Sequence, residues 1–131
     1  MRRTLIAIAA AAAALGAAHA QTAVGTGSHV FVTAQPTDVL SYNLIGVKIT
    51  NGENKDIGEI KDLVLSKDTL AGYIVSVGGF LGMGEHYVVV SPSALKISYL
   101  ENDKKWTATM DATKEDLKSA PEFKYEGRWK R

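Results

Sequence analysis

GGFLGMG, residues 78–84, separates two segments whose composition is typical of β-strands, 72–77 and 86–90. Glycine adopts positive φ angles and permits close backbone approach. We therefore predict that Gly78, Gly79, Gly82 and Gly84 form a structural turn. Phe80, Leu81 and Met83 are large and apolar where a loop is normally polar, so we expect them either to plug a barrel end or to contact a partner.

Short β-type segments surround this stretch at intervals of about ten residues. Apolar residues alternate or run continuously in six of them: 45–50, 57–65, 72–77, 86–90, 95–99 and 106–110. Asn51-Gly52 and Ser66–Asp68 are expected to be turns. The alternation breaks near Asp62, which predicts either a β-bulge or a residue pair buried on both sides. The Asp62 carboxylate is expected to bond to backbone groups at a bulge or turn. The spacing favours a small barrel or sandwich.

Two further elements are predicted outside this series. Thr113 is a candidate helix N-cap, with Asp116 near the helix dipole and Pro121 as a stop, so a helix of about two turns should lie between them. Its Leu117 should face the core. The segment 29–33 has strand composition and could add one short strand.

The first twenty residues have the pattern of a cleavable signal peptide. Arg2 and Arg3 precede an apolar run, and Ala18-His19-Ala20 is a small-x-small cleavage site. The apolar run spans 14 residues, fewer than the roughly 18 of a spanning helix. We expect cleavage after Ala20, a periplasmic or secreted location and no membrane span in the mature chain.

Charge and cysteine content narrow the classes of function. Loss of the leader leaves 13 basic against 14 acidic side chains, a formal charge of −1, which does not favour a nucleic-acid partner. The sequence has no cysteine, which excludes thiol catalysis, CxxC redox chemistry and Cys-ligated zinc.

No catalytic or cofactor motif is complete. The spacing of Gly79 to Gly84 matches a phosphate-binding loop, but Glu85 and His86 replace its Lys-Ser/Thr pair and a strand follows. Glu85 and His86, with Glu59 or Asp62, are weak candidates for a metal or small-ligand site. A hydrolase has the least support, because neither a nucleophile elbow nor a converging carboxylate pair is recognisable. We predict a non-catalytic protein without a cofactor.

The C-terminal segment 121–131 places Phe123, Tyr125 and Trp129 among four basic residues. Aromatic residues at even spacing pack as an extended arm along a protein's own sheet or dock on a partner. The first interpretation is favoured. The three aromatic residues remain candidates for an interaction site.

Several of these segments together resemble the PRC-barrel domain. The resemblance rests on Leu44–Val47, Asp56–Val64, Gly78–Gly84 and Val90-Ser91-Pro92, and covers residues 40–120. It implies a mainly β fold, a small six-stranded antiparallel barrel with one short C-terminal helix. Members of this family include the cytoplasmic domain of a photosynthetic reaction-centre subunit and a domain of a ribosome maturation factor, which are docking or assembly modules.

The resemblance and the leader together predict an exported interaction or assembly module of the cell envelope. The expected organisation is a signal peptide (1–20), a tether (21–39), the barrel domain (40–120) and an aromatic, basic tail (121–131). The partner would be an unidentified envelope protein or a second copy in a homo-oligomer. A barrel that binds a small ligand or metal ion is the alternative.

Overall fold

The computed structural model describes residues 30–78 and 84–131. Contacts divide the chain after Pro36 into two units, and of the first unit residues 30–36 are described. They form no strand, so the strand expected over 29–33 is not present over 30–33, and His29 lies outside the described residues. Val30, Phe31 and Val32 are exposed. Strand composition alone does not make these residues a strand, because a strand is stable only when it pairs with neighbours in a sheet.

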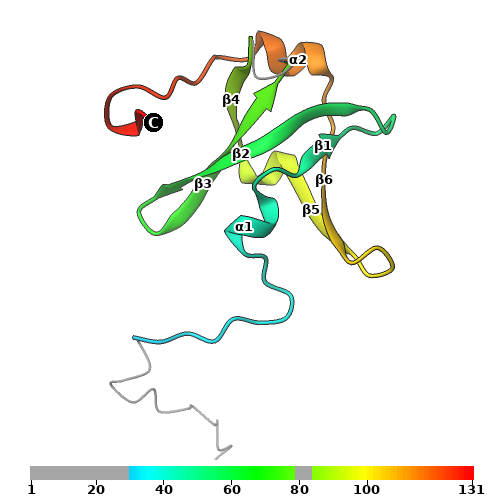
Figure 1. Cartoon of the computed structure of the whole chain (residues 1–131), viewed down its shortest axis with the longest axis vertical. Helices are drawn as coiled ribbons and strands as arrows, with labels where there is room; N and C mark the ends of the chain where they lie inside the picture. Colours follow the sequence, from blue (N-terminus) through cyan, green and yellow to red (C-terminus); the bar gives the residue numbers. More distant parts are fainter. Residues whose placement is uncertain (1–29, 79–83) are drawn as a thin grey trace, which may run out of the picture. The chain divides into compact units, whose positions relative to one another are not determined.

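The second unit, residues 37–131, contains six strands and two short α-helices among its described residues (Figure 1). This mainly β content confirms the prediction. The elements in order are α1 (Ser41–Leu44), β1 (Lys48–Thr50), β2 (Asp56–Ser66), β3 (Thr69–Val77), β4 (His86–Val90), the 3₁₀ turn η1 (Pro92–Ala94), β5 (Leu95–Leu100), β6 (Lys105–Met110), α2 (Lys114–Ser119) and the 3₁₀ turn η2 (Gly127–Trp129).

The predicted closed antiparallel barrel is wrong in two respects. The strands form one sheet in the order β4-β3-β2-β1-β6-β5, with β4 and β5 as its edges, so the sheet is not closed. β1 pairs with β6 in parallel while the other pairings are antiparallel, which makes the sheet mixed. The predicted first strand is also shorter, because α1 precedes it and β1 begins only at Lys48.

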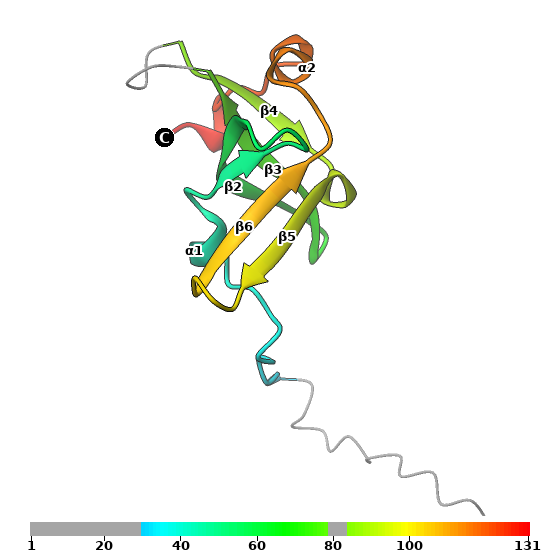
Figure 2. The same cartoon turned by 90° about the vertical axis from the view of Figure 1, so that its right-hand side faces the viewer.

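The two edge strands are nevertheless consecutive in the chain. Only Ser91–Ala94 join β4 to β5, a link that spans at most about 18 Å, so the sheet has to curl (Figure 2). Pro92 starts η1, and the Ser91 side chain accepts a hydrogen bond from the Ser93 amide at 3.3 Å. This 3₁₀ turn occupies the link, and hydrogen bonds do not continue from β4 to β5.

The break in alternation near Asp62 is a β-bulge, as predicted. The pairing of β2 with β3 shifts between Ile60 and Asp62, and the Leu63 amide donates to Asp62 Oδ1 at 2.9 Å. The hairpin closes through Lys67 and Asp68, both with positive φ. The bulge places Asp62 and Ile74 opposite each other on one face and so positions the site described below.

The core lies inside the curled sheet and combines all six strands with both helices. Its members are Leu44, Ile49, Ile57, Ile60, Tyr73, Val75, Val77, Val88, Val90, Leu95, Ala108 and Leu117. Thr113 caps the α2 helix, as predicted, and Asp116 bonds back to it, so that the two residues form a capping box. Its Leu117 enters the core, which confirms the predicted helix.

The described residues contain no helix long and apolar enough to cross a membrane.

Candidate functional site

The outer face of β2, β3 and β4, opposite the core, carries two rows of side chains. Successive residues of a strand point to opposite faces, and Ser76 and Ile74 alternate with the core residues of β3. The register aligns Glu59 with Ser76 and Tyr87 in one row, and Asp62 with Ile74 and Val89 in the other. The first row is polar. The second row is largely apolar.

The polar row and the neighbouring residues Lys61 and Glu85 form a network of hydrogen bonds and ion pairs. We call it the polar cluster: Glu59, Lys61, Ser76, Glu85 and Tyr87. The Tyr87 hydroxyl donates to Glu85 Oε2, and the Ser76 hydroxyl donates to Glu85 Oε1 at 3.2 Å. Lys61 forms an ion pair with Glu59, and its Nζ lies 3.8 Å from Glu85 Oε1. The ionisable side chains of the cluster therefore find their hydrogen-bond and ion-pair partners within the cluster.

These contacts shift the acid–base equilibria of the cluster. The hydrogen bond from Tyr87 is the main cause that lowers the pKa of Glu85, and Ser76 and the charge of Lys61 act in the same direction. The same hydrogen bond and burial raise the pKa of Tyr87. The pKa of Lys61 is raised by its bond to Glu59. The shifts favour a deprotonated Glu85 and a protonated Tyr87 and Lys61, which are the states that these contacts require.

The tail, residues 121–131, packs against this face and extends the sheet by one bridge. The Phe123 amide donates to the Tyr87 carbonyl at 2.6 Å. The ring of Tyr125 lies 5.3 Å from that of Tyr87 in an edge-to-face contact, and Phe123 lies 5.4 Å from Trp129. The tail therefore covers part of the outer face as an aromatic arm, which was the favoured interpretation of its sequence.

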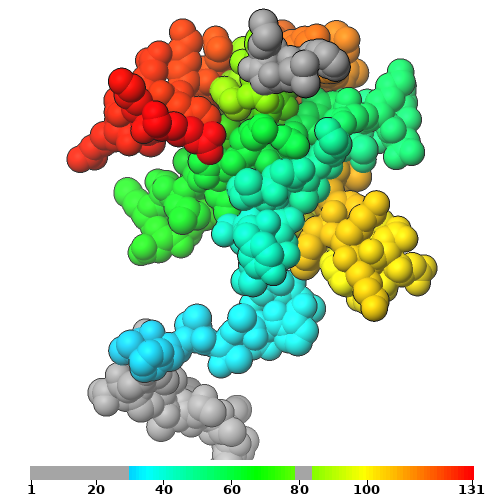
Figure 3. Space-filling view, in the orientation of Figure 1, coloured from blue at the N-terminus to red at the C-terminus, as the bar shows by residue number. Residues whose placement is uncertain are grey.

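An apolar groove of about 500 Å³ remains between the tail and the second row. Its lining residues come from β2, β3, β4 and the tail: Asp62, Leu63, Val64, Leu65, Ile74, Val89, Phe123, Tyr125, Trp129 and Arg131. Three large apolar side chains of this groove are exposed, with Leu65 at 71%, Trp129 at 64% and Val89 at 46%. In Figure 3 the tail (red) and the β2–β3 hairpin (green) lie beside each other on one face.

The chain was compared with models of known protein families. The model of the PRC-barrel domain matches residues 36–117. The chain belongs to the PRC-barrel domain family. Comparison of this PRC-barrel chain with curated proteins gives no significant match.

The glycine stretch of the PRC-barrel is described only at its two ends. Gly78 and Gly84 have φ angles of +69° and +74°, a region that favours glycine, as the predicted turn requires. Gly79, Phe80, Leu81, Gly82 and Met83 lie outside the described residues. The interaction role of Phe80, Leu81 and Met83 stays a prediction.

The weak metal candidates, Glu85 and His86, contact different parts of the PRC-barrel. Glu85 bonds to Tyr87 and Ser76, whereas His86 Nε2 lies 3.3 Å from the Ala120 carbonyl and Nδ1 lies 3.9 Å from Glu122. The described residues contain no group of three His, Cys, Asp or Glu side chains placed to hold a metal ion. These contacts do not favour a metal site formed by Glu85 and His86 together.

Sequence reasoning missed the sheet residues of the groove, Leu65, Ile74 and Val89. A signal for them is present, because strands of continuous apolar or β-branched residues are typically buried on both faces. Residues 72–77 and 88–90 have this composition. The second face of β3 is indeed covered, since Ile74 is 4% exposed yet lies outside the core cluster.

The lowered pKa of Glu85 predicts a pH dependence of stability. A carboxylate with a lowered folded-state pKa stabilises the fold above its unfolded pKa, and this contribution is lost as the pH falls through the folded value. Glu85→Gln should therefore reduce the decrease in melting temperature between about pH 6 and about pH 3. Circular dichroism melts measure this, with the exposed turn variant Glu101→Gln as control. Equal pH dependence in Glu85→Gln and wild type would contradict the role of Glu85.

Proposed function

We propose that this PRC-barrel chain is an exported, non-catalytic protein–protein interaction or assembly module of the cell envelope. The observation that carries the proposal is the apolar groove, in which Leu65, Val89 and Trp129 are exposed beside one another. Contiguous exposed apolar surface on a folded domain marks an interface, because water contact with it is unfavourable.

Two observations support a role in binding rather than catalysis. The ionisable side chains of the polar cluster pair with one another, so they contribute to holding β2, β3 and β4 in register. The groove beside them is framed by regular strands and a tail anchored by aromatic contacts. A preformed apolar surface on such a frame lowers the ordering cost of binding. The pattern of residues 1–20 supports export.

Cross-linking in intact producing cells, followed by mass spectrometry, tests this proposal. We expect the wild-type chain to cross-link to a partner protein through the groove and to begin at Gln21. Leu65→Ser should reduce the cross-linked product at least about tenfold, since it places a polar group in a desolvated contact. Its melting temperature should change by only about 2 °C, because exposed positions contribute little to stability.

Tyr42→Ser is the matched control for this experiment. Tyr42 is 73% exposed on α1 and does not line the groove, so its substitution should leave the cross-linked product unchanged. The proposal is wrong if Leu65→Ser retains the wild-type product, or if the two variants lose it equally. Recovery of the chain with residues 1–20 still attached would contradict the export part.

A further inference from the structure

The groove contains its own projecting anchor, Trp129. Trp129 is the last residue of η2, which begins at Gly127 with a φ of +61°. Its ring contacts Phe123 while 64% of the residue stays exposed. Tryptophan is enriched among the residues that dominate binding energy, because one rigid side chain buries a large area. The surface thus presents both a cavity and a rigid group of the kind that fills cavities.

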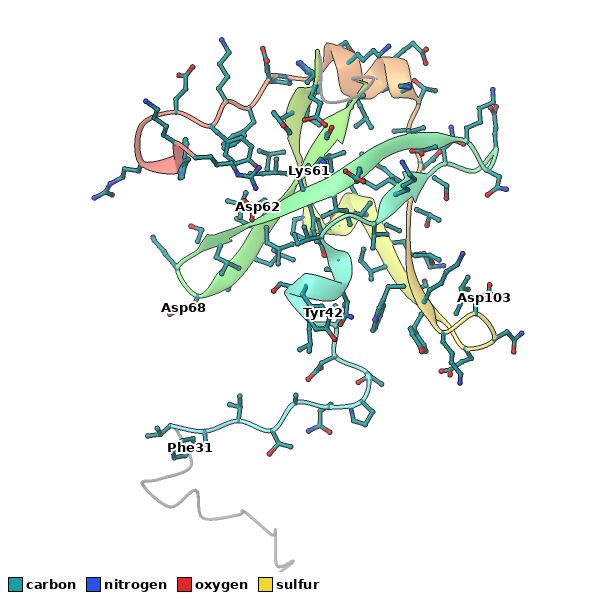
Figure 4. All side chains as sticks on the ribbon, in the orientation of Figure 1. Phe31, Tyr42, Lys61, Asp62, Asp68 and Asp103 are labelled. Carbon is teal, nitrogen blue, oxygen red and sulfur yellow. The ribbon has the colours of Figure 1, made fainter. Side chains whose placement is uncertain are left out.

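Two opposite charges also line this groove, one on each side. Asp62 belongs to β2, where Figure 4 shows it beside the tail, and Arg131 belongs to the tail. Within the part of the chain that the structure describes, neither side chain is in an ion pair. Asp62 accepts the Leu63 amide, and the Arg131 guanidinium lies 4.6 Å from the centre of the Tyr125 ring. An occupant that matches both sides must therefore offer a base opposite Asp62 and an acid opposite Arg131.

The groove itself carries a base, Arg131, and an acid, Asp62, so a second copy of the chain offers this combination. In a two-fold symmetric contact, a residue i that meets residue j of the partner is repeated as j meeting i. A two-fold axis across the groove would place Arg131 of each copy opposite Asp62 of the other and Trp129 of each copy against the exposed Leu65 and Val89. An occupant of one charge sign would leave either Asp62 or Arg131 unmatched.

We propose that the groove is closed by a second copy of this chain, in a symmetric dimer held by two Trp129 anchors and two Asp62–Arg131 pairs. This inference rests on the proposed interaction function and names its partner. Sedimentation equilibrium of the purified chain, from about 1 to about 200 µM, should show a reversible monomer–dimer equilibrium. Trp129→Ser should weaken it at least about tenfold, and Tyr42→Ser should not change it.

A charge-exchange experiment identifies the second copy as the occupant. Asp62→Arg places like charges opposite each other twice in a homodimer, and so does Arg131→Asp, so each variant alone should be about tenfold or more weaker in self-association. An equimolar mixture of the two variants restores both opposite-charge pairs. We expect the mixture to dimerise within about threefold of wild type. Recovery in the mixture also shows that both variants are folded.

Three outcomes would overturn the dimer. They are a monomeric wild-type chain over the whole concentration range, a mixture no stronger than its two components, and equal weakening by Tyr42→Ser and Trp129→Ser. The result in cells separates this inference from the proposed function. If the purified chain is monomeric but Leu65→Ser still abolishes a cross-link to another protein, the interaction function holds and self-association is wrong.

Discussion

Replacing Ile60 with alanine is expected to lower the free energy of unfolding by about 3 to 4 kcal/mol, a typical cost of truncating a fully buried isoleucine. Ile60 is 0% exposed and belongs to the core cluster. Its backbone is fixed as well, since its amide donates to the Val47 carbonyl at 2.9 Å and its carbonyl accepts from Gly46 at 2.8 Å. With the backbone held on both sides, the cavity left by the side chain has little room to collapse.

Urea unfolding followed by circular dichroism measures this loss. Leu65→Ala is the matched control, because it truncates an aliphatic residue of the same strand that is 71% exposed. At low protein concentration its free energy of unfolding should change by no more than about 0.5 kcal/mol. Losses of similar size in the two variants would contradict the assignment of Ile60 to the core and of Leu65 to the groove.

The strands of this fold could be predicted because their signals are local. Alternation in 95–99 and 106–110 and the turns at Asn51-Gly52 and Ser66–Asp68 each lie within a few residues, and the structure has strands on both sides of each turn. The helix α2 could be predicted for the same reason, since Thr113, Asp116 and Leu117 lie within five residues. These local signals predict the strands and the helix even when it is not known which strands pair with each other.

The order in which the strands pair could not be predicted from such local signals. The parallel contact of β1 with β6 joins Ile49 to Ala108, residues far apart in the chain, and no turn composition specifies it. The prediction of Ile45 and Val47 as strand residues failed because alternation alone does not distinguish a strand from the chain that leaves a short helix. Leu44 at the end of α1 is instead buried at 3% exposure.

In the candidate site, too, the feature with a local sequence signal could be predicted and the feature that depends on strand pairing could not. The aromatic spacing of Phe123, Tyr125 and Trp129 predicted an arm along the sheet, and the arm is present. The groove depends on the alignment of Asp62, Ile74 and Val89 across three strands. A bulge between Ile60 and Asp62 brings Asp62 into that alignment. Moving the bulge by one residue would send the Asp62 side chain to the other face of the sheet, away from Ile74 and Val89.

Close approach of β2 and β3 explains a second large expected effect, that of Gly58→Ala. A Cβ added at Gly58 would lie 2.9 Å from the Ser76 carbonyl oxygen and 2.8 Å from Val75 Cγ1. The first contact is with backbone, so a side-chain rotation does not relieve it, and the strands would have to separate. Overpacking of this kind costs about 1 to 3 kcal/mol, and the backbone contact places Gly58→Ala toward the upper end.

Gly52→Ala is the control, because a Cβ at Gly52 meets no atom within 4 Å. We expect its free energy of unfolding to stay within about 0.5 kcal/mol of wild type, while Gly58→Ala loses about 2 to 3 kcal/mol in the same urea experiment. Separation of the strands would also disturb the register of Glu59 with Ser76, and with it the polar cluster. If Gly58→Ala were as stable as Gly52→Ala, β2 and β3 would have room to move apart, and the aligned rows that build the groove would not be rigid.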